Sequence, residues 1–204
     1  MKIDIAKERE EKEQKLQRSL NDKREWVFKM IFTTKKPNKN VKRMVDQMRM
    51  FFRPETLYEN ENMFIREKDI EKFTSQMMTS HYLFVRSTGA DKIEIDIVDR
   101  RNKNKITYKL IDYENNFKTY KNEIYKERAL LSVNGFEESP QEKEMFEGLF
   151  VRDLKKKFRR VLLISKEDDA VYIRHYMYKS ADDTKNYIVT LCEIGPRFTL
   201  RRIK

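Results

Sequence analysis

The stretch Glu193-Ile194-Gly195-Pro196-Arg197-Phe198-Thr199-Leu200 contains a Gly-Pro step between two runs typical of β-strands. Gly195 can adopt a positive φ, whereas Pro196 fixes its own φ and donates no backbone hydrogen bond. Proline also disfavours the helical region for the residue before it, so a regular ladder cannot continue through this step. The stretch predicts a strand, a kink and a second strand, with Arg197 presented at the kink. A plain bulge whose arginine is merely solvated is an equally good interpretation at this point.

The composition predicts a basic globular protein. The chain has 204 residues, a formal net charge of +11, 39% apolar and 39% charged residues, and 13 Phe and 10 Tyr to supply large core side chains. Such a charge favours a polyanionic partner, either nucleic acid or an anionic membrane surface. No stretch approaches the roughly 18 apolar residues that span a bilayer, and the single cysteine, Cys192, fits a reducing compartment. We therefore expect a soluble intracellular protein with no membrane partner.

Strand and helix patterns repeat along the chain, which predicts the α/β (α+β) class. Residues 1–25 are nearly all charged or polar and predict a solvated helix or arm. Residues 26–128 and 129–204 each have a strand, a helix and further strands, which predicts two similar tandem halves, each a mixed β-sheet with packed helices. The helices are expected at 41–52, 67–78, 117–128 and from 140, and the strands at 26–33, 81–87, 92–98, 106–113, 130–133, 160–165, 170–178 and 187–203.

The helix expected from residue 140 has a marked start signal. Ser139 stands at the N-cap position, Pro140 at the first helical position and Glu142 at the third, the Ser-x-x-Glu arrangement of a capping box. We expect the Ser139 side chain to cap this helix.

Residue types that carry catalysis are scarce. Only four glycines occur, at 89, 135, 148 and 195, so no glycine-rich phosphate-binding loop can be written. His81 and His175 each fall within a predicted strand, where a histidine is more often structural than catalytic. We predict no catalytic residue, no metal site, no cofactor and no small-molecule substrate. A Mg²⁺ site built from scattered carboxylates stays open as an alternative, and with it an unrecognised nuclease.

Positive charge is concentrated in clusters that suit phosphate groups. Phosphate neutralisation by such clusters gives affinity without base specificity. Simple solvation, or contact with acidic proteins, is the alternative, and charge alone does not separate RNA from DNA. The candidate nucleic-acid contacts are Lys35, Lys36, Lys39, Lys42, Arg43, Arg49, Arg53, Lys155, Lys156, Lys157, Arg159, Arg160, Arg174, Arg197, Arg201 and Arg202.

One predicted strand also combines aromatic and basic side chains on one face. Tyr172, Arg174, Tyr176 and Tyr178 alternate along residues 170–178. Their rings suit stacking on unpaired bases, while the commoner interpretation is that they are core aromatics.

Several motifs in order resemble the Brix family of ribosome-assembly factors, most closely its Ssf/Peter Pan branch. The closing E-I-G-P-R-F-T-L (193–200) resembles the C-terminal signature of the family, and R-R-V-L-L-I (159–164) followed by V-Y-I-R-H-Y (171–176) resembles a pair of motifs in that branch. L-S-V-N-G-F (131–136), N-V-K-R-M-V (40–45) and T-S-H-Y-L (79–83) add to the likeness, which covers residues 26–203. The sequence departs from the family at Gln76-Met77-Met78, where a glycine-proline pair is expected, and near Asn102–Thr107, where a Gly-Pro-Thr-like step is expected. The long charged insertion of the family is reduced to Ala181–Asn186, and the usual basic tail is missing.

The resemblance implies a Brix domain of two anticodon-binding-domain-like halves and a non-enzymatic role. It further implies binding to precursor ribosomal RNA in the nucleolus, and a scaffold for early large-subunit assembly with other assembly factors and ribosomal proteins as partners. Arg197 and Arg174 fall in the matching motifs and are the first RNA contacts that it suggests. A Brix protein of another branch, serving the small subunit or the 5S particle, is the alternative, and so is a protein–protein scaffold without direct RNA contact.

Overall fold

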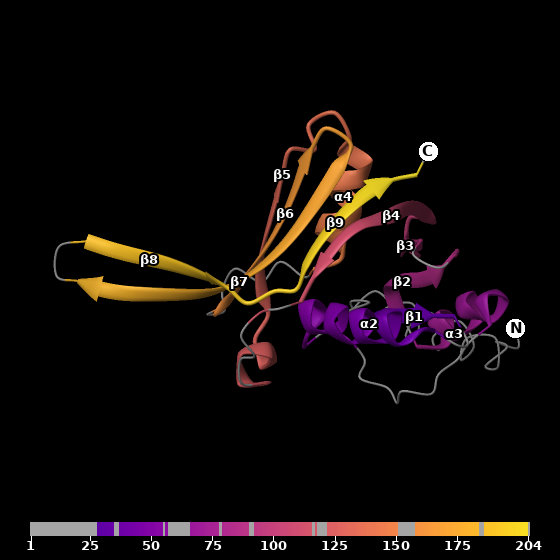
Figure 1. The fold of residues 1–204 in the computed structure, drawn as a ribbon, viewed down its shortest axis with the longest axis horizontal. Helices are drawn as coiled ribbons and strands as arrows, with labels where there is room; N and C mark the ends of the chain where they lie inside the picture. The colour runs from indigo at the N-terminus through magenta and orange to yellow at the C-terminus, as the bar shows by residue number, and fades with distance from the viewer. Residues whose placement is uncertain are drawn as a thin grey trace, which may run out of the picture.

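The computed structural model of the protein describes residues 28–34, 37–54, 56, 66–77, 79–89, 92–115, 117, 122–150, 158–183 and 186–203. Its strands form one mixed sheet in the order β1-β2-β3-β4-β9-β7-β6-β5, with β8 paired to β7 (Figure 1). The strands are β1 Phe28–Thr33, β2 Thr79–Ser87, β3 Ile93–Asp99, β4 Asn104–Glu114, β5 Ala129–Asn134, β6 Arg160–Glu167, β7 Ala170–Asp183, β8 Asn186–Glu193 and β9 Arg197–Arg202.

The two ends of the sheet have the same strand pairing. In one half β1 runs parallel to β2, and β2, β3 and β4 follow as antiparallel neighbours. In the other half β5 runs parallel to β6, and β6, β7 and β9 follow in the same way. The halves join where β4 pairs with β9. Each parallel pair requires a crossover, and a helix supplies it: α2 (Lys39–Phe52) between β1 and β2, and α4 (Pro140–Gly148) between β5 and β6.

The local sequence of α2 explains why this segment forms a helix. Asn38 stands at the N-cap, and its side-chain oxygen accepts a hydrogen bond of 2.8 Å from the backbone N–H of Val41. The helix buries one apolar stripe and exposes a basic one. The buried side chains are Val41, Met44, Val45, Met48, Phe51 and Phe52.

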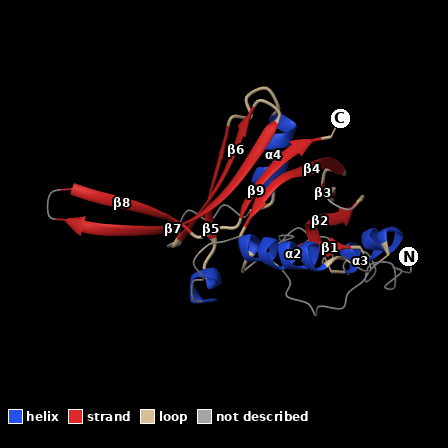
Figure 2. Cartoon of the chain, viewed as in Figure 1, coloured by secondary structure: helices blue, strands red, loops and turns tan. Residues whose placement is uncertain are grey.

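The main core is shared by both halves. Phe51 of α2 packs edge-on against Phe198 of β9, with the ring centroids 5.4 Å apart, and Phe146 of α4 lies 5.7 Å from the ring of Tyr108 in β4. Each helix therefore contacts a strand of the opposite half, and one apolar cluster runs through α2, α4 and both ends of the sheet. A second cluster lies on the far side of the first half, where α3 (Ile70–Gln76) covers β1, β2 and β3. Figure 2 shows these helices beside the strands.

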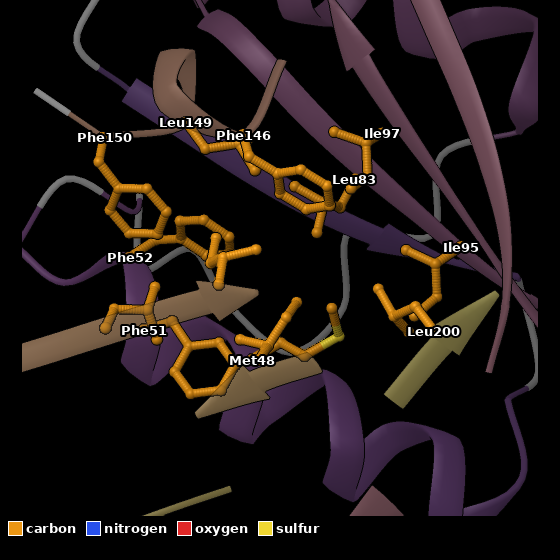
Figure 3. A pocket seen from close by; sticks show the side chains of 13 residues that line it. Met48, Phe51, Phe52, Leu83, Ile95, Ile97, Phe146, Leu149, Phe150 and Leu200 are labelled. Atoms are coloured by element: carbon orange, nitrogen blue, oxygen red, sulfur yellow. The ribbon is translucent and has the colours of Figure 1, made fainter. Parts of the chain in front are cut away.

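A small cavity lies inside the shared core (Figure 3). Its volume is about 20 Å³, and all 13 lining residues, among them Met48, Phe146 and Leu200, are apolar. Space of this size holds about one water molecule, but a water molecule needs two or more polar partners, which this lining does not offer. The cavity is therefore a packing defect at the junction of the halves.

The structure confirms the mixed α/β class, a kinked path from β8 to β9, and a positive φ of 55° at Gly195. The helix expected over 117–128 is, in the part described, a short 3₁₀ helix, η2 (Asn122–Lys126). A second 3₁₀ helix, η1 (Glu67–Asp69), precedes α3. The arm at 1–25 lies outside the described residues, and the division of the chain at residue 128 stays a prediction.

The prediction of a capping box at the start of α4 is wrong. The Ser139 side chain makes no capping hydrogen bond, and its hydroxyl accepts one of 2.8 Å from Lys166 Nζ. Glu142 is fully buried; it pairs with Lys166 at 2.7 Å and accepts a hydrogen bond from the Tyr108 hydroxyl. Because a buried carboxylate needs partners, this network takes the groups that a capping box would have used. It also ties α4 to both halves of the sheet.

Candidate nucleic-acid interface

The outward side of α2 carries a compact group of cations, Lys39, Lys42 and Arg43, called here the basic helix face. All three side chains are exposed, and none forms an ion pair with another described residue. The first turn contains no acidic residue, and the partial positive charge of the helix N-terminus adds to theirs. Asp46, on the next turn, is held by Arg49 at 2.7 Å. The basic helix face therefore has an uncompensated positive charge that suits phosphate groups.

The other predicted nucleic-acid contacts near α2 are less accessible to a phosphate group. Arg49 is half-buried; it pairs with Asp46 and donates a hydrogen bond of 3.4 Å to the carbonyl oxygen of Ile31. Arg53 caps the C-terminus of the helix and is half-buried. Lys35, Lys36 and Lys155 to Lys157 lie outside the described residues, so their role stays a prediction.

Arg160, predicted as an RNA contact, is buried, so the structure gives that prediction no support. It begins β6 on the core side of the sheet and is 0% exposed. Its guanidinium donates hydrogen bonds of 3.1 Å to Met50 O, 2.6 Å to Arg53 O and 2.6 Å to Glu127 O. It also lies over the ring of Tyr125, at 5.1 Å. Since two of these carbonyls end α2, a residue of the second half satisfies the helix C-terminus of the first.

His175 joins this arrangement to the kink. Its backbone oxygen accepts hydrogen bonds from the N–H groups of Ile194 and Gly195, at 2.8 and 3.3 Å. Its Nδ1 lies 3.0 Å from Gly195 O, and its Nε2 lies 3.2 Å from Arg160. Burial, reinforced by the charge of Arg160, lowers the pKa of His175 to about 3. This histidine is therefore neutral at pH 7 and holds the backbone of the kink.

His81 occupies a comparable buried position on β2. It is 0% exposed, with its Nε2 3.5 Å from Asp99 and its Nδ1 3.1 Å from the Ser80 hydroxyl. Burial lowers the pKa of His81 to about 4, although the negative charge of Asp99 acts in the opposite direction. Both histidines are thus inaccessible to solvent, as expected for structural residues.

Arg197 lies at the kink as predicted, but it is not simply presented to solvent. Its guanidinium forms two hydrogen bonds with Glu193, of 2.7 and 2.5 Å, and pairs with Glu114 at 3.1 Å. It lies over the ring of Phe117, at 5.2 Å, and its side chain is 39% exposed. Hydrogen bonding to Glu193 raises the pKa of Arg197. Two carboxylates therefore already balance the charge that the sequence assigned to RNA.

The aromatic and basic row of β7 lies on the side of the sheet away from α2 and α4, called here the open face. Tyr172, Tyr176 and Tyr178 are half-buried there and belong to none of the apolar clusters formed by the described residues. Arg174 lies 5.4 Å from the ring of Tyr172 and donates a hydrogen bond of 3.1 Å to Phe198 O. The interpretation of these tyrosines as core residues is therefore wrong.

The remaining candidates are spread over the surface. Arg159 lies 3.3 Å from Glu127, and Arg202 lies 3.9 Å from Glu142. Arg201 is exposed directly opposite Lys109, a residue of β4 that the sequence did not single out. Like charges directly opposite on neighbouring strands are destabilising, so this pair is a second point where an anion is favoured. In the sequence, only the alternating pattern of residues 104–114 pointed to Lys109. That pattern does not reveal that β4 pairs with β9, which is what places Lys109 opposite Arg201.

No group of three or more His, Cys, Asp or Glu side chains within the described ranges could hold a metal ion. None of the helices in the same part of the chain is long and apolar enough to cross a membrane.

The fold and its surface define a duplicated α/β protein in which two similar halves of one sheet share one core, with the basic helix face of α2 exposed beside it. This chain belongs to the Brix domain family, whose model matches residues 34–204. It is similar in structure to a probable ribosomal biogenesis protein from Aeropyrum pernix K1, with a TM-score of 0.55 and 9% identity. That match covers 87% of this chain and 97% of the other. No curated protein matches the sequence.

Proposed function

We propose that this protein is a non-enzymatic ribosome-assembly factor that binds precursor ribosomal RNA and scaffolds early large-subunit particles in the nucleolus. Membership of the Brix family supports the assembly role, and the structural neighbour is itself described as a probable ribosomal biogenesis protein. The basic helix face carries the RNA-binding part of the proposal, because its three cations are exposed and unpaired among the described residues. Burial of both histidines favours a binding protein over an enzyme.

The test is the salt dependence of binding to a structured RNA, with a double charge reversal on the basic helix face. Each phosphate contact contributes about −0.7 to −0.9 to the slope of log K against log salt. The variant Lys42→Glu/Arg43→Glu should therefore bind more weakly, and its slope should be less steep by roughly 1.4 to 1.8 because two phosphate contacts are lost. The matched control Lys68→Glu/Lys72→Glu changes the same number of exposed lysine or arginine charges at η1 and α3. A flat salt dependence, or an equal loss of slope in the control, would refute RNA binding through this face.

The large-subunit assignment has its own test. It is supported by the sequence resemblance to the Ssf/Peter Pan branch, carried by the R-H-Y and N-G-F runs at 174–176 and 134–136. The protein should cosediment with precursors of the large subunit. Cosedimentation with small-subunit precursors would replace that branch by another while leaving the family unchanged.

A further inference from the structure

Two side-chain amides lie at the end of the basic helix face. Lys39, Arg43 and Gln47 are spaced i, i+4 and i+8 on α2, so they follow one side of the helix. Asn115 is the residue after β4. The hydroxyl of Tyr113 joins the two amides, because it donates a hydrogen bond to Gln47 Oε1 and accepts one of 3.2 Å from Asn115 Nδ2. The amides of Gln47 and Asn115, called here the amide pair, therefore converge on one oxygen atom beside a line of cations.

Tyr113 holds the amide pair in a fixed position. Its ring stacks on Phe198 of β9, with the ring centroids 5.1 Å apart and the planes at 25°. Burial raises the pKa of Tyr113, while the hydrogen bond from Asn115 and the charge of Arg43 act in the opposite direction. The hydroxyl is therefore protonated at pH 7, and Arg43 lies close enough to act on it. Side chains that are already ordered in this way lose little further freedom when they bind a ligand.

The amide pair presents unused hydrogen-bonding groups. Because Gln47 Oε1 accepts from the hydroxyl of Tyr113, the NH₂ group of Gln47 is left free of it. Because Asn115 Nδ2 donates to the same hydroxyl, Asn115 Oδ1 is left free of it. Both amide residues are half-buried, and among the described residues neither amide has a further hydrogen-bond partner. The pair therefore offers donors beside an acceptor at the surface.

The charge around the amide pair favours an anionic ligand. Arg43 is exposed and forms no ion pair with another residue that the structure describes. The carboxylates next to the cluster in sequence, Asp46 and Glu114, are held by Arg49 at 2.7 Å and by Arg197 at 3.1 Å. A nucleotide joins an anionic phosphate to a base that carries donors and acceptors, so a phosphate at Arg43 brings its base to the amides.

We propose that the amide pair hydrogen-bonds the edge of an unpaired RNA base whose neighbouring phosphates bind the basic helix face. Phosphate contacts fix the register of a nucleic acid but carry no sequence information, whereas amide side chains distinguish bases by their donors and acceptors. Unpaired bases expose these edges, which base pairing occupies inside an RNA helix. The protein then selects among RNA sequences. This inference rests on the proposed function for the class of its ligand.

The test measures the affinity and salt slope of the full chain for single-stranded oligonucleotides of adenylate, cytidylate and uridylate. The wild-type protein should prefer one of them by about tenfold or more, with equal slopes, because hydrogen bonds to bases release no counterions. Gln47→Ala and Asn115→Ala should each reduce that preference to within about threefold and leave the slope unchanged. The control Asn134→Ala, which removes an exposed amide at the end of β5, should change neither quantity.

The variant Tyr113→Phe tests the hydroxyl as a positioning group. It keeps the ring on Phe198 and removes the oxygen that holds both amides. The base preference should therefore decrease while the midpoint of urea unfolding changes little. A hydroxyl that only stabilises the fold would lower the midpoint and leave the preference intact.

The outcomes separate this inference from the proposed function. Equal affinity of the wild-type protein for the three oligonucleotides, or an unchanged preference in Gln47→Ala and Asn115→Ala, would overturn this inference alone. Gln47→Ala decides the question if Asn115→Ala does not fold, because alanine favours the helix. Lys42→Glu/Arg43→Glu reports on the proposed function, since it should lower affinity and slope for all three oligonucleotides alike. A wild-type protein that binds no RNA would overturn both.

Discussion

Replacing Arg160 by methionine should destabilise the protein strongly while leaving its surface charge pattern almost unchanged. Methionine keeps the length and apolar character of the side-chain stem but removes the guanidinium from three carbonyl oxygens. Hydrogen bonds to a charged group contribute about 1.5–3 kcal/mol each, and relief of the desolvation of the arginine offsets part of that loss. We expect a net decrease of roughly 3–5 kcal/mol in the free energy of unfolding. For a chain of this length that corresponds to about 6–20 °C in Tm.

The assay is urea unfolding followed by far-UV circular dichroism, with the denaturation midpoint and slope fitted together. The control is Arg159→Met, one residue earlier, because Arg159 is 62% exposed and its pair with Glu127 lies at the surface. An exposed pair of this kind contributes less than about 1 kcal/mol. The reasoning is refuted if Arg160→Met unfolds at the wild-type midpoint, and the RNA-contact interpretation returns if that stable variant also loses RNA affinity.

Two further predictions concern stability. The pKa values of His175 and His81 are about 3 and about 4 in the folded protein, below the ordinary value near 6.5, so each contributes stability that is complete above pH 6.5 and decreases as the pH falls. Urea unfolding at pH 6.5 and pH 5 should differ by roughly 1.5–2 kcal/mol per histidine, and equal stability at the two pH values would contradict their burial as neutral groups. Gly195→Ala should cost more than about 1 kcal/mol, because φ is 55° and an added Cβ would lie 2.0 Å from Phe117. The control Gly89→Ala, with open space around it, should stay within about 0.5 kcal/mol in the same assay, and comparable losses in both variants would discount the strain at the kink.

Much of the fold could be predicted because its local signals are strong. The apolar spacing of 41–52 correctly predicted α2, and the alternation of 92–98 correctly predicted β3. The glycine-proline step correctly predicted the kink between β8 and β9. The sequence could not show that α2 and α4 contact strands of the opposite half, because periodicity identifies a buried stripe and not what buries it. The capping box failed for a related reason. Local capping chemistry was overruled by a buried carboxylate that needed Lys166 and Tyr108.

The candidate site was harder to predict than the fold. Charge counting found the basic helix face, since Lys42 and Arg43 are exposed on a helix whose opposite side is core. The same counting treated Arg160 and Arg197 as equivalent to them, although the first is buried among carbonyls and the second is held by two glutamates. Which cations are free depends on contacts between residues far apart in sequence. Arg197 and Glu114, for example, are separated by 83 residues.

The pairing of β4 with β9 has a consequence for the order in which the protein folds. β4 is the inner edge of the first half, and its partner strand lies some 80 residues further along the chain. During synthesis the edge of β4 stays unpaired until β9 has emerged from the ribosome. Phe51 likewise lacks its ring contact with Phe198 until then. Contacts of such long sequence separation slow folding, and an unpaired strand edge invites association with other chains. The newly made chain is therefore most vulnerable to aggregation between completion of β4 and arrival of β9, the interval in which a chaperone would protect it most.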